Sequence, residues 1–137
     1  MITAVDTNIL LDVLLPDPNH QASSLARLHQ ALQEGTLVIN DVVCSELGAH
    51  FQVAGEMERF LKGVNIAFSP FSLRAAHDAG QRWRQYLRNR KGVRERIVAD
   101  FMIASHAIHH ADRLLTRDLG FYRGYFPELK LMEDSLK

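Results

Sequence analysis

Short apolar runs alternate along the chain with longer stretches in which apolar residues recur every three or four positions. Runs of three to five mainly apolar residues, bounded by polar or turn-forming residues, are typical of buried strands. Five segments have this form, at residues 2–5, 37–39, 64–68, 113–115 and 129–132. The chain is therefore expected to contain five short strands.

The stretches between these runs have the period of a helix. In residues 20–34 apolar side chains recur at helical spacing up to Leu32, and Gly35 ends the pattern. Further helices are expected from about Ile9, from Asn40 or Asp41 to Phe51, and over residues 56–61, 73–88 and 97–111. Strands that alternate with helices favour a mostly parallel sheet with helices on both faces. The expected fold class is α/β, in a single domain over residues 1–137.

Composition narrows the class of protein. With 137 residues, 47% of them apolar, the chain is long enough to form one globular core. No apolar run approaches the roughly 18 residues of a membrane-spanning helix, and no signal-peptide pattern precedes the first strand. Cys44 is the only cysteine, which excludes an internal disulfide and fits a reducing compartment. A cytoplasmic protein is expected.

Charge is balanced overall but concentrated in one stretch. The chain has 16 basic and 16 acidic residues. Between residues 81 and 96, Glu95 is the only acid, against the basic residues Arg82, Arg84, Arg88, Arg90, Lys91, Arg94 and Arg96. Such a local excess of positive charge can hold a phosphate backbone, although a solvated helix face explains it equally well.

Four acidic residues stand where burial normally disfavours a charge. Asp6 follows the first strand and Asp118 follows the fourth, and open α/β sheets bind their ligands at such carboxyl ends. Glu46 and Asp100 lie on helix faces with mainly apolar neighbours, so both are expected to point inward. Each acid alone fits a helix cap or an ion pair. Four together would repel one another unless a cation, such as Arg96 or a divalent metal ion, lies between them.

Hard divalent cations such as Mg²⁺ and Mn²⁺ suit a site of carboxylates, and other chemistry fits less well. His106 and His110 have the spacing of a zinc helix, but the helix lacks the glutamate of a metalloprotease, so surface histidines are expected. Asp6 could be a phosphatase nucleophile, but Asn8 stands where that motif needs a second aspartate. Thr7 or Asn8 is expected to cap the first helix, which leaves Asp6 for a metal ion.

Four segments of the chain resemble one family of proteins. They are VDTNILLD at the start, SEL ending at residue 47, ADFMIASHA around residue 100 and LLTRDLGFYRGYFPELKL towards the end. In this order and spacing they resemble the PIN-domain ribonucleases, and among these the VapC-type toxins of prokaryotic toxin–antitoxin pairs. The resemblance spans nearly the whole chain. It implies a three-layer α/β/α fold with a five-stranded, mostly parallel sheet.

The resemblance also implies a site and partners. The family's catalytic, metal-binding acids fall on Asp6, Glu46, Asp100 and Asp118, and its supporting polar positions fall on Asn8 and Thr116. Many members carry an acid three residues after a TRN sequence, where this chain has Phe121. Asp118 is therefore expected to assist metal binding as the weakest of the four acids. The resemblance further implies Mg²⁺- or Mn²⁺-dependent endoribonuclease activity, a homodimer, and neutralisation by a small cognate antitoxin.

In this interpretation the basic stretch holds the RNA substrate beside the acidic site. The residues assigned to RNA binding are Arg88, Arg90, Lys91, Arg94 and Arg96. Trp83 lies among them on an amphipathic helix and is expected to belong to the core. Two alternatives stay open: a non-catalytic PIN-like module that binds a partner protein, and a metal-dependent phosphatase.

Overall fold

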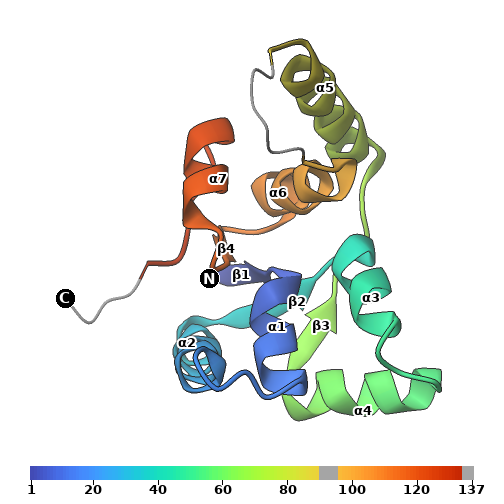
Figure 1. Ribbon diagram of the computed structural model, residues 1–137, viewed down its shortest axis with the longest axis vertical. Helices are drawn as coiled ribbons and strands as arrows, with labels where there is room; N and C mark the ends of the chain where they lie inside the picture. The colour runs from blue at the N-terminus through green and yellow to red at the C-terminus, as the bar shows by residue number, and fades with distance from the viewer. Residues whose placement is uncertain (90–95, 134–137) are drawn as a thin grey trace.

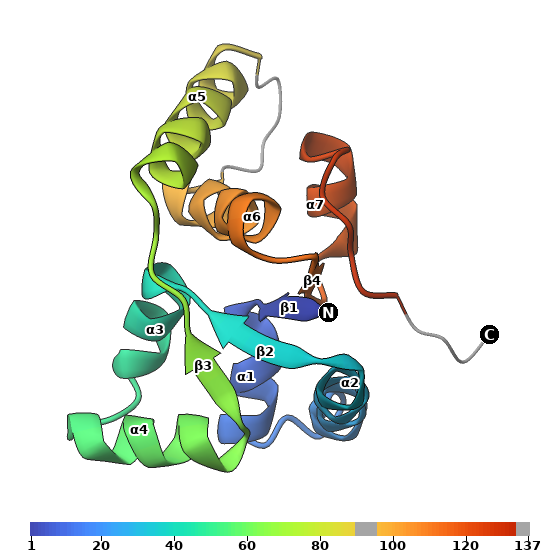
Figure 2. The ribbon, with the colours of Figure 1, turned by 180° about the vertical axis from the view of Figure 1, so that it is seen from behind.

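The computed structural model describes residues 1–89 and 96–133, in which four parallel strands form one sheet. The strands are β1 (Ile2–Val5), β2 (Thr36–Ile39), β3 (Ile66–Phe68) and β4 (Arg113–Leu115), in the order β3-β2-β1-β4. On one side of the sheet lie α1 (Thr7–Leu14), α2 (Gln21–Glu34), α3 (Asp41–Gly48) and α4 (Ala54–Gly63). On the other side lie α5 (Leu73–Asn89), α6 (Val98–His110) and α7 (Leu119–Tyr125) (Figure 1 and Figure 2). The predicted α/β class is confirmed.

The predicted fifth strand over residues 129–132 is wrong. Only Leu131 pairs with the sheet there, as an isolated parallel bridge to Leu114 beside β4. The amide of Leu129 donates to the carbonyl oxygen of Phe126 at 3.0 Å, which holds the chain in a turn until just before the bridge. The segment therefore has room for one pair of ladder hydrogen bonds and no more.

The local sequence explains where the other elements begin and end. The strands are mostly buried because helices cover both faces, so their residues form a continuous apolar core. Asn40 caps α3 as predicted, with its Oδ1 accepting from the amide of Val43 at 2.9 Å. Gly35 ends α2 at φ 157°, where a Cβ atom would lie 1.8 Å from the carbonyl oxygen of Met1. In the described parts of the chain no helix is long and apolar enough to cross a membrane.

The strand order brings the carboxyl ends of β1 and β4 side by side, at the place where a parallel sheet forms its ligand-binding crevice. The chain passes from β1 to β2 on one side of β1, and β4 then pairs with the other side of β1. Parallel sheets bind ligands where successive connections diverge in this way. The residues that follow these two strands are Asp6 and Thr116, and Asp6 donates its amide to the carbonyl oxygen of Leu115 at 2.9 Å. Two predicted site segments, 110 residues apart in sequence, therefore meet.

His106 is a buried residue of α6 and not the surface residue that its sequence context predicted. It is fully buried, and its ring lies 5.4 Å from that of Phe71. Its Nε2 atom lies 3.0 Å from Ser69 Oγ, whereas Nδ1 is buried without a partner among the described residues. Burial, and then the charge of nearby His110, lower the pKa of His106 from 6.5 to about 4. The imidazole is therefore neutral in the folded protein.

Acid is expected to destabilise the protein through His106. Between pH 6.5 and 4 the unfolded chain binds a proton at this ring and the folded chain does not, so stability falls as the pH drops through this window. The slope approaches about 1.4 kcal/mol per pH unit. Urea unfolding of His106→Gln should show a pH dependence shallower by this amount, whereas the matched substitution at exposed His29 should leave the slope unchanged. Equal slopes for the wild type and His106→Gln would contradict the assignment.

Candidate functional site

Asp6 lies between β1 and α1 with 6% of its surface exposed. Its Oδ1 atom accepts a hydrogen bond from the amide of Thr7 at 2.7 Å and so caps α1. Its Oδ2 atom accepts from the Thr116 hydroxyl at 2.7 Å, the Tyr122 hydroxyl at 3.2 Å and the Asn8 side-chain amide at 3.4 Å. The prediction that Thr7 or Asn8 caps α1 in its place is wrong. A carboxylate has two oxygens, so Asp6 caps with one and faces the crevice with the other.

The surroundings of Asp6 favour an additional cation. Burial raises the pKa of Asp6 from 3.8 to about 6, although its hydrogen bonds oppose the shift, and the charge of Glu46 adds to it. The groups that donate hydrogen bonds to Asp6 in the described structure are all neutral. A buried carboxylate held by neutral donors gains stability from an approaching positive charge. The donor set is made of hard oxygens, so it fits Mg²⁺ or Mn²⁺ better than a thiophilic ion.

Glu46 reaches the crevice from α3 without being buried. The residue is exposed, contrary to the expectation of an inward-facing acid. Val43 and Leu47 form the buried side of α3, and Glu46 lies beside that side in the last turn of the helix. Its Oε1 atom nevertheless accepts a hydrogen bond from the Thr7 hydroxyl at 2.6 Å. Thr7 thus links the two acids, because its hydroxyl donates to Glu46 and its backbone amide donates to Asp6. The carboxylate is held beside Asp6 while its other oxygen faces solvent.

Asp100 and Asp118 stand at the beginnings of two helices and are both half-buried. Asp100 lies in the first turn of α6, where its Oδ2 accepts from the amide of Ile97 at 3.4 Å. Asp118 precedes α7 and pairs with Arg96, whose Nη1 lies 2.7 Å from Asp118 Oδ2. The amide of Asp118 donates to Thr116 Oγ1 at 3.0 Å. This bond links Asp118 through one hydroxyl to Asp6.

Tyr122 of α7 lies near three of the four acids. Its side chain is 1% exposed, and its pKa is raised far above the ordinary value by burial and then by the charges of Asp6, Asp100 and Asp118. Glu46 acts in turn on Asp6. No three of the four predicted acids, all within the described structure, bring their oxygens within 4.8 Å of one another. The four carboxylates therefore do not form a closed cluster.

Thr116 and Asn8 support Asp6, at the positions that the sequence assigned to them. The Thr116 hydroxyl donates to Asp6 and accepts from the side-chain amide of Asn8 at 3.4 Å. The carbonyl oxygen of the Asn8 side chain accepts from the amide of Arg117 at 3.3 Å. Both side chains are occupied in positioning Asp6 and the turn after β4. A carboxamide is not a general acid, so Asn8 cannot supply the proton that the phosphatase mechanism considered from the sequence requires.

The structure describes two of the five basic residues assigned to RNA binding. Arg88 is exposed near the end of α5, and Arg96 pairs with Asp118 inside the acidic region. The remaining three, Arg90, Lys91 and Arg94, lie outside the described residues. Trp83 packs against the core as predicted, with its ring 5.4 Å from that of Phe101.

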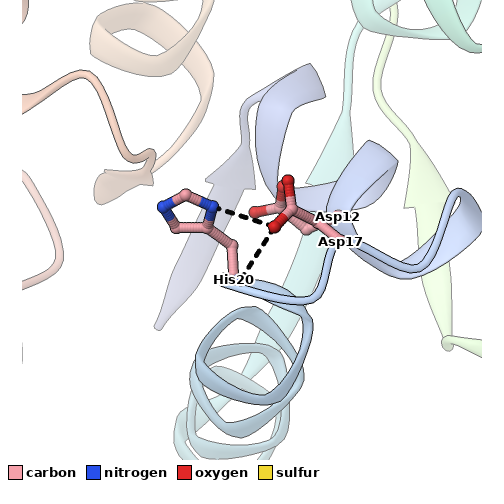
Figure 3. Close-up of side chains that lie close together, drawn as sticks. All are labelled: Asp12, Asp17 and His20. Carbon is pink, nitrogen blue, oxygen red and sulfur yellow. Dashed lines mark hydrogen bonds and ion pairs between the residues drawn. The ribbon is translucent and has the colours of Figure 1, made fainter.

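A second acidic cluster lies where α1 leads into α2 (Figure 3). Donor atoms of Asp12, Asp17 and His20 lie within 4.8 Å of one another, close enough to hold a cation. Asp12 is 3% exposed, however, and its two oxygens already bind Arg117 at 2.8 and 3.0 Å. The Ser24 hydroxyl donates to Asp12 as well, at 2.6 Å. The guanidinium of Arg117 therefore already supplies this cluster with a positive charge.

Sequence reasoning missed three residues that shape the site: Thr7, Arg117 and Tyr122. Tyr122 stands among other aromatic residues near the end of the chain, and the available signal was that a buried phenol needs a hydrogen-bond partner. Arg117 stands between two predicted site residues and anchors their turn to Asp12. Nothing in the local sequence indicated this pairing, because its partners are 105 residues apart.

The fold and the site together define the class of protein. The sequence matches the family described as PIN domain over residues 3–127, so the chain belongs to the PIN domain family. PIN domains are typically nucleases that depend on metal ions. None of the curated proteins matches the chain.

Several solved structures share the fold over nearly the whole chain. VapBC2 from Rickettsia felis, bound to a DNA fragment from its promoter, is 25% identical with a TM-score of 0.71, covering 96% of this chain and 98% of that chain. VapBC-1 from nontypeable Haemophilus influenzae is 22% identical with a TM-score of 0.70, covering 97% and 98%. FitAcB from Neisseria gonorrhoeae is 23% identical with a TM-score of 0.64, covering 97% of both chains. The resemblance to PIN domains of the VapC type is confirmed.

Proposed function

We propose that this chain is a Mg²⁺- or Mn²⁺-dependent endoribonuclease that hydrolyses RNA phosphodiester bonds. One observation carries the proposal: Asp6 is a buried carboxylate whose described hydrogen-bond donors are neutral, and Glu46, Asp100 and Asp118 lie near it. Membership of the PIN domain family supports the reaction class.

The residues of the chain have separate parts in this proposal. Asp6, Glu46 and Asp100 would hold the divalent cation, and Asp118 would assist. When bound, the cation supplies a water of lowered pKa and positive charge beside the scissile phosphate. Thr116 and Tyr122 donate hydrogen bonds to Asp6 Oδ2 and so fix the direction of that carboxylate. Removing such a supporting contact typically lowers metal affinity or activity by about 10- to 100-fold.

Purified protein incubated with RNA and Mg²⁺ tests the reaction. Cleavage should occur, stop on addition of EDTA, and be lost in Asp100→Asn, while Glu58→Gln, which changes an exposed acid on α4, should cleave like the wild type. Retained cleavage by Asp100→Asn would show that the site is assigned wrongly. Hydrolysis of small phosphomonoesters without RNA cleavage would favour the phosphatase alternative, and inactivity on both would favour the non-catalytic binding module.

The proposal includes a protein partner. The similar structures carry the names of VapBC and FitAB assemblies, so a toxin role for this chain, neutralised by a cognate antitoxin, is part of the proposed function. Growth arrest on expression of the chain should be relieved by co-expression of its antitoxin. A homodimer would have twice the 15.6 kDa mass of the chain in light scattering.

A further inference from the structure

Arg96 is fixed at three points beside the acidic crevice. Its backbone amide donates to the hydroxyl of Tyr86 at 3.0 Å. Its guanidinium lies 2.7 Å from Asp118 Oδ2 and 4.0 Å from the ring centroid of Phe121. Only 14% of the side chain is exposed. A guanidinium held by a carboxylate and an aromatic face keeps one position better than a solvated surface arginine does.

The charge of Arg96 acts most directly on Asp118. The two side chains form an ion pair with an N–O distance of 2.7 Å, and a guanidinium keeps its positive charge in a folded protein. Arg96 therefore offsets the negative charge of Asp118, which directly precedes α7. Asp6 and Glu46 have no ion pair among the described residues.

This distribution divides the crevice into two halves. The half around Asp118 already contains a cation that belongs to the chain. Among the described residues, the half around Asp6 contains a carboxylate whose hydrogen-bond donors are all neutral. A divalent ion bound against Asp118 would meet a fixed positive charge at short range, and like charges that close repel strongly in a partly buried site.

We propose that Arg96 is the built-in counter-ion of Asp118 and takes the place of a second metal ion, so that each chain binds one divalent cation, at Asp6, Glu46 and Asp100. This inference rests on the proposed metal-dependent function. Arg96 is then a positioning residue, and not an RNA contact as the basic stretch suggested.

Counting bound Mn²⁺ by electron paramagnetic resonance of the free ion tests the inference without measuring activity. The wild type should bind one Mn²⁺ per chain, and Arg96→Gln should bind a second, weaker ion. The second ion should disappear again in the double variant Arg96→Gln/Asp118→Asn. Arg59→Gln, which removes an exposed positive charge on α4, should keep a stoichiometry of one.

A second variant covers the case in which Arg96→Gln fails to fold. Asp118→Asn alone should keep one bound Mn²⁺ but with weaker affinity, because Arg96 loses its partner and its charge then opposes the ion at Asp100. Two ions in the wild type, reduced to one by Asp118→Asn, would overturn the counter-ion role while leaving the nuclease proposal intact. A wild type that binds no Mn²⁺ and cleaves no RNA would overturn both.

Discussion

RNA cleavage by Asp6→Asn is expected to be on the order of 100-fold slower than by the wild type, or slower still, because the variant loses the buried negative charge of the site. The fold should survive, since an asparagine oxygen can still accept from the amide of Thr7 and cap α1. The free energy of unfolding at pH 7 should stay the same or rise, because the raised pKa of Asp6 means that its ionised form is disfavoured by burial. Initial cleavage rates and urea unfolding curves measure the two effects.

The opposite directions of these effects make the prediction specific. A substitution that merely damages the protein lowers activity and stability together. Glu58→Gln, an exposed acid on α4, should change neither. Wild-type cleavage by Asp6→Asn would remove Asp6 from the site, and a large loss of stability would mean that its role is structural.

Asp12→Ala is expected to lower the free energy of unfolding by about 3 kcal/mol, near the lower end for breaking a buried ion pair. Asp12 is 3% exposed and holds both Arg117 and Ser24. The cost stays at that lower end because the Arg117 side chain is 37% exposed and can turn to water once its partner is gone. Urea unfolding at pH 7 measures it.

Loss of the Asp12–Arg117 ion pair should also lower the activity of the site. Arg117 lies between Thr116 and Asp118 in sequence, and its amide donates to Asn8. Freed from Asp12, this turn should hold the Thr116 hydroxyl less firmly against Asp6, and cleavage should fall by about 10-fold. Glu58→Ala serves as the matched control. Unchanged stability in Asp12→Ala would contradict the buried pairing.

Most of the fold could be predicted because it follows from local patterns. The strands at residues 2–5 and 37–39 are continuous apolar runs, as burial on both faces requires. Asn40 is a side chain that caps helices in isolation, so its role needed no tertiary information. The strand over residues 129–132 was predicted wrongly because pairing with β4 is set by the turn that ends at Leu129, a contact the apolar run does not encode.

Some residues of the candidate site could likewise be predicted from local sequence, and others could not. Asp6 and Asp118 could be found because each follows a strand, and strand ends meet at one edge of a parallel sheet, whereas Thr116 followed from the resemblance to PIN domains. The exposure of Glu46 and the burial of His106 could not be predicted from the sequence, because both depend on where neighbouring helices end and how they pack. The pairing of Arg96 with Asp118 joins positions 22 residues apart, across elements whose contact only the fold defines.

The ends of the RNA fragments test the central claim most directly. Hydrolysis by an activated water at the acidic crevice should leave a 5′-phosphate and a 3′-hydroxyl on every product. End-labelled RNA cleaved by the wild type with Mg²⁺ should carry these ends, and Asp6→Asn and Asp100→Asn, purified in parallel, should produce none of them. Fragments ending in a 2′,3′-cyclic phosphate, or equal yields from the wild type and both variants, would contradict a metal-dependent nuclease site at Asp6.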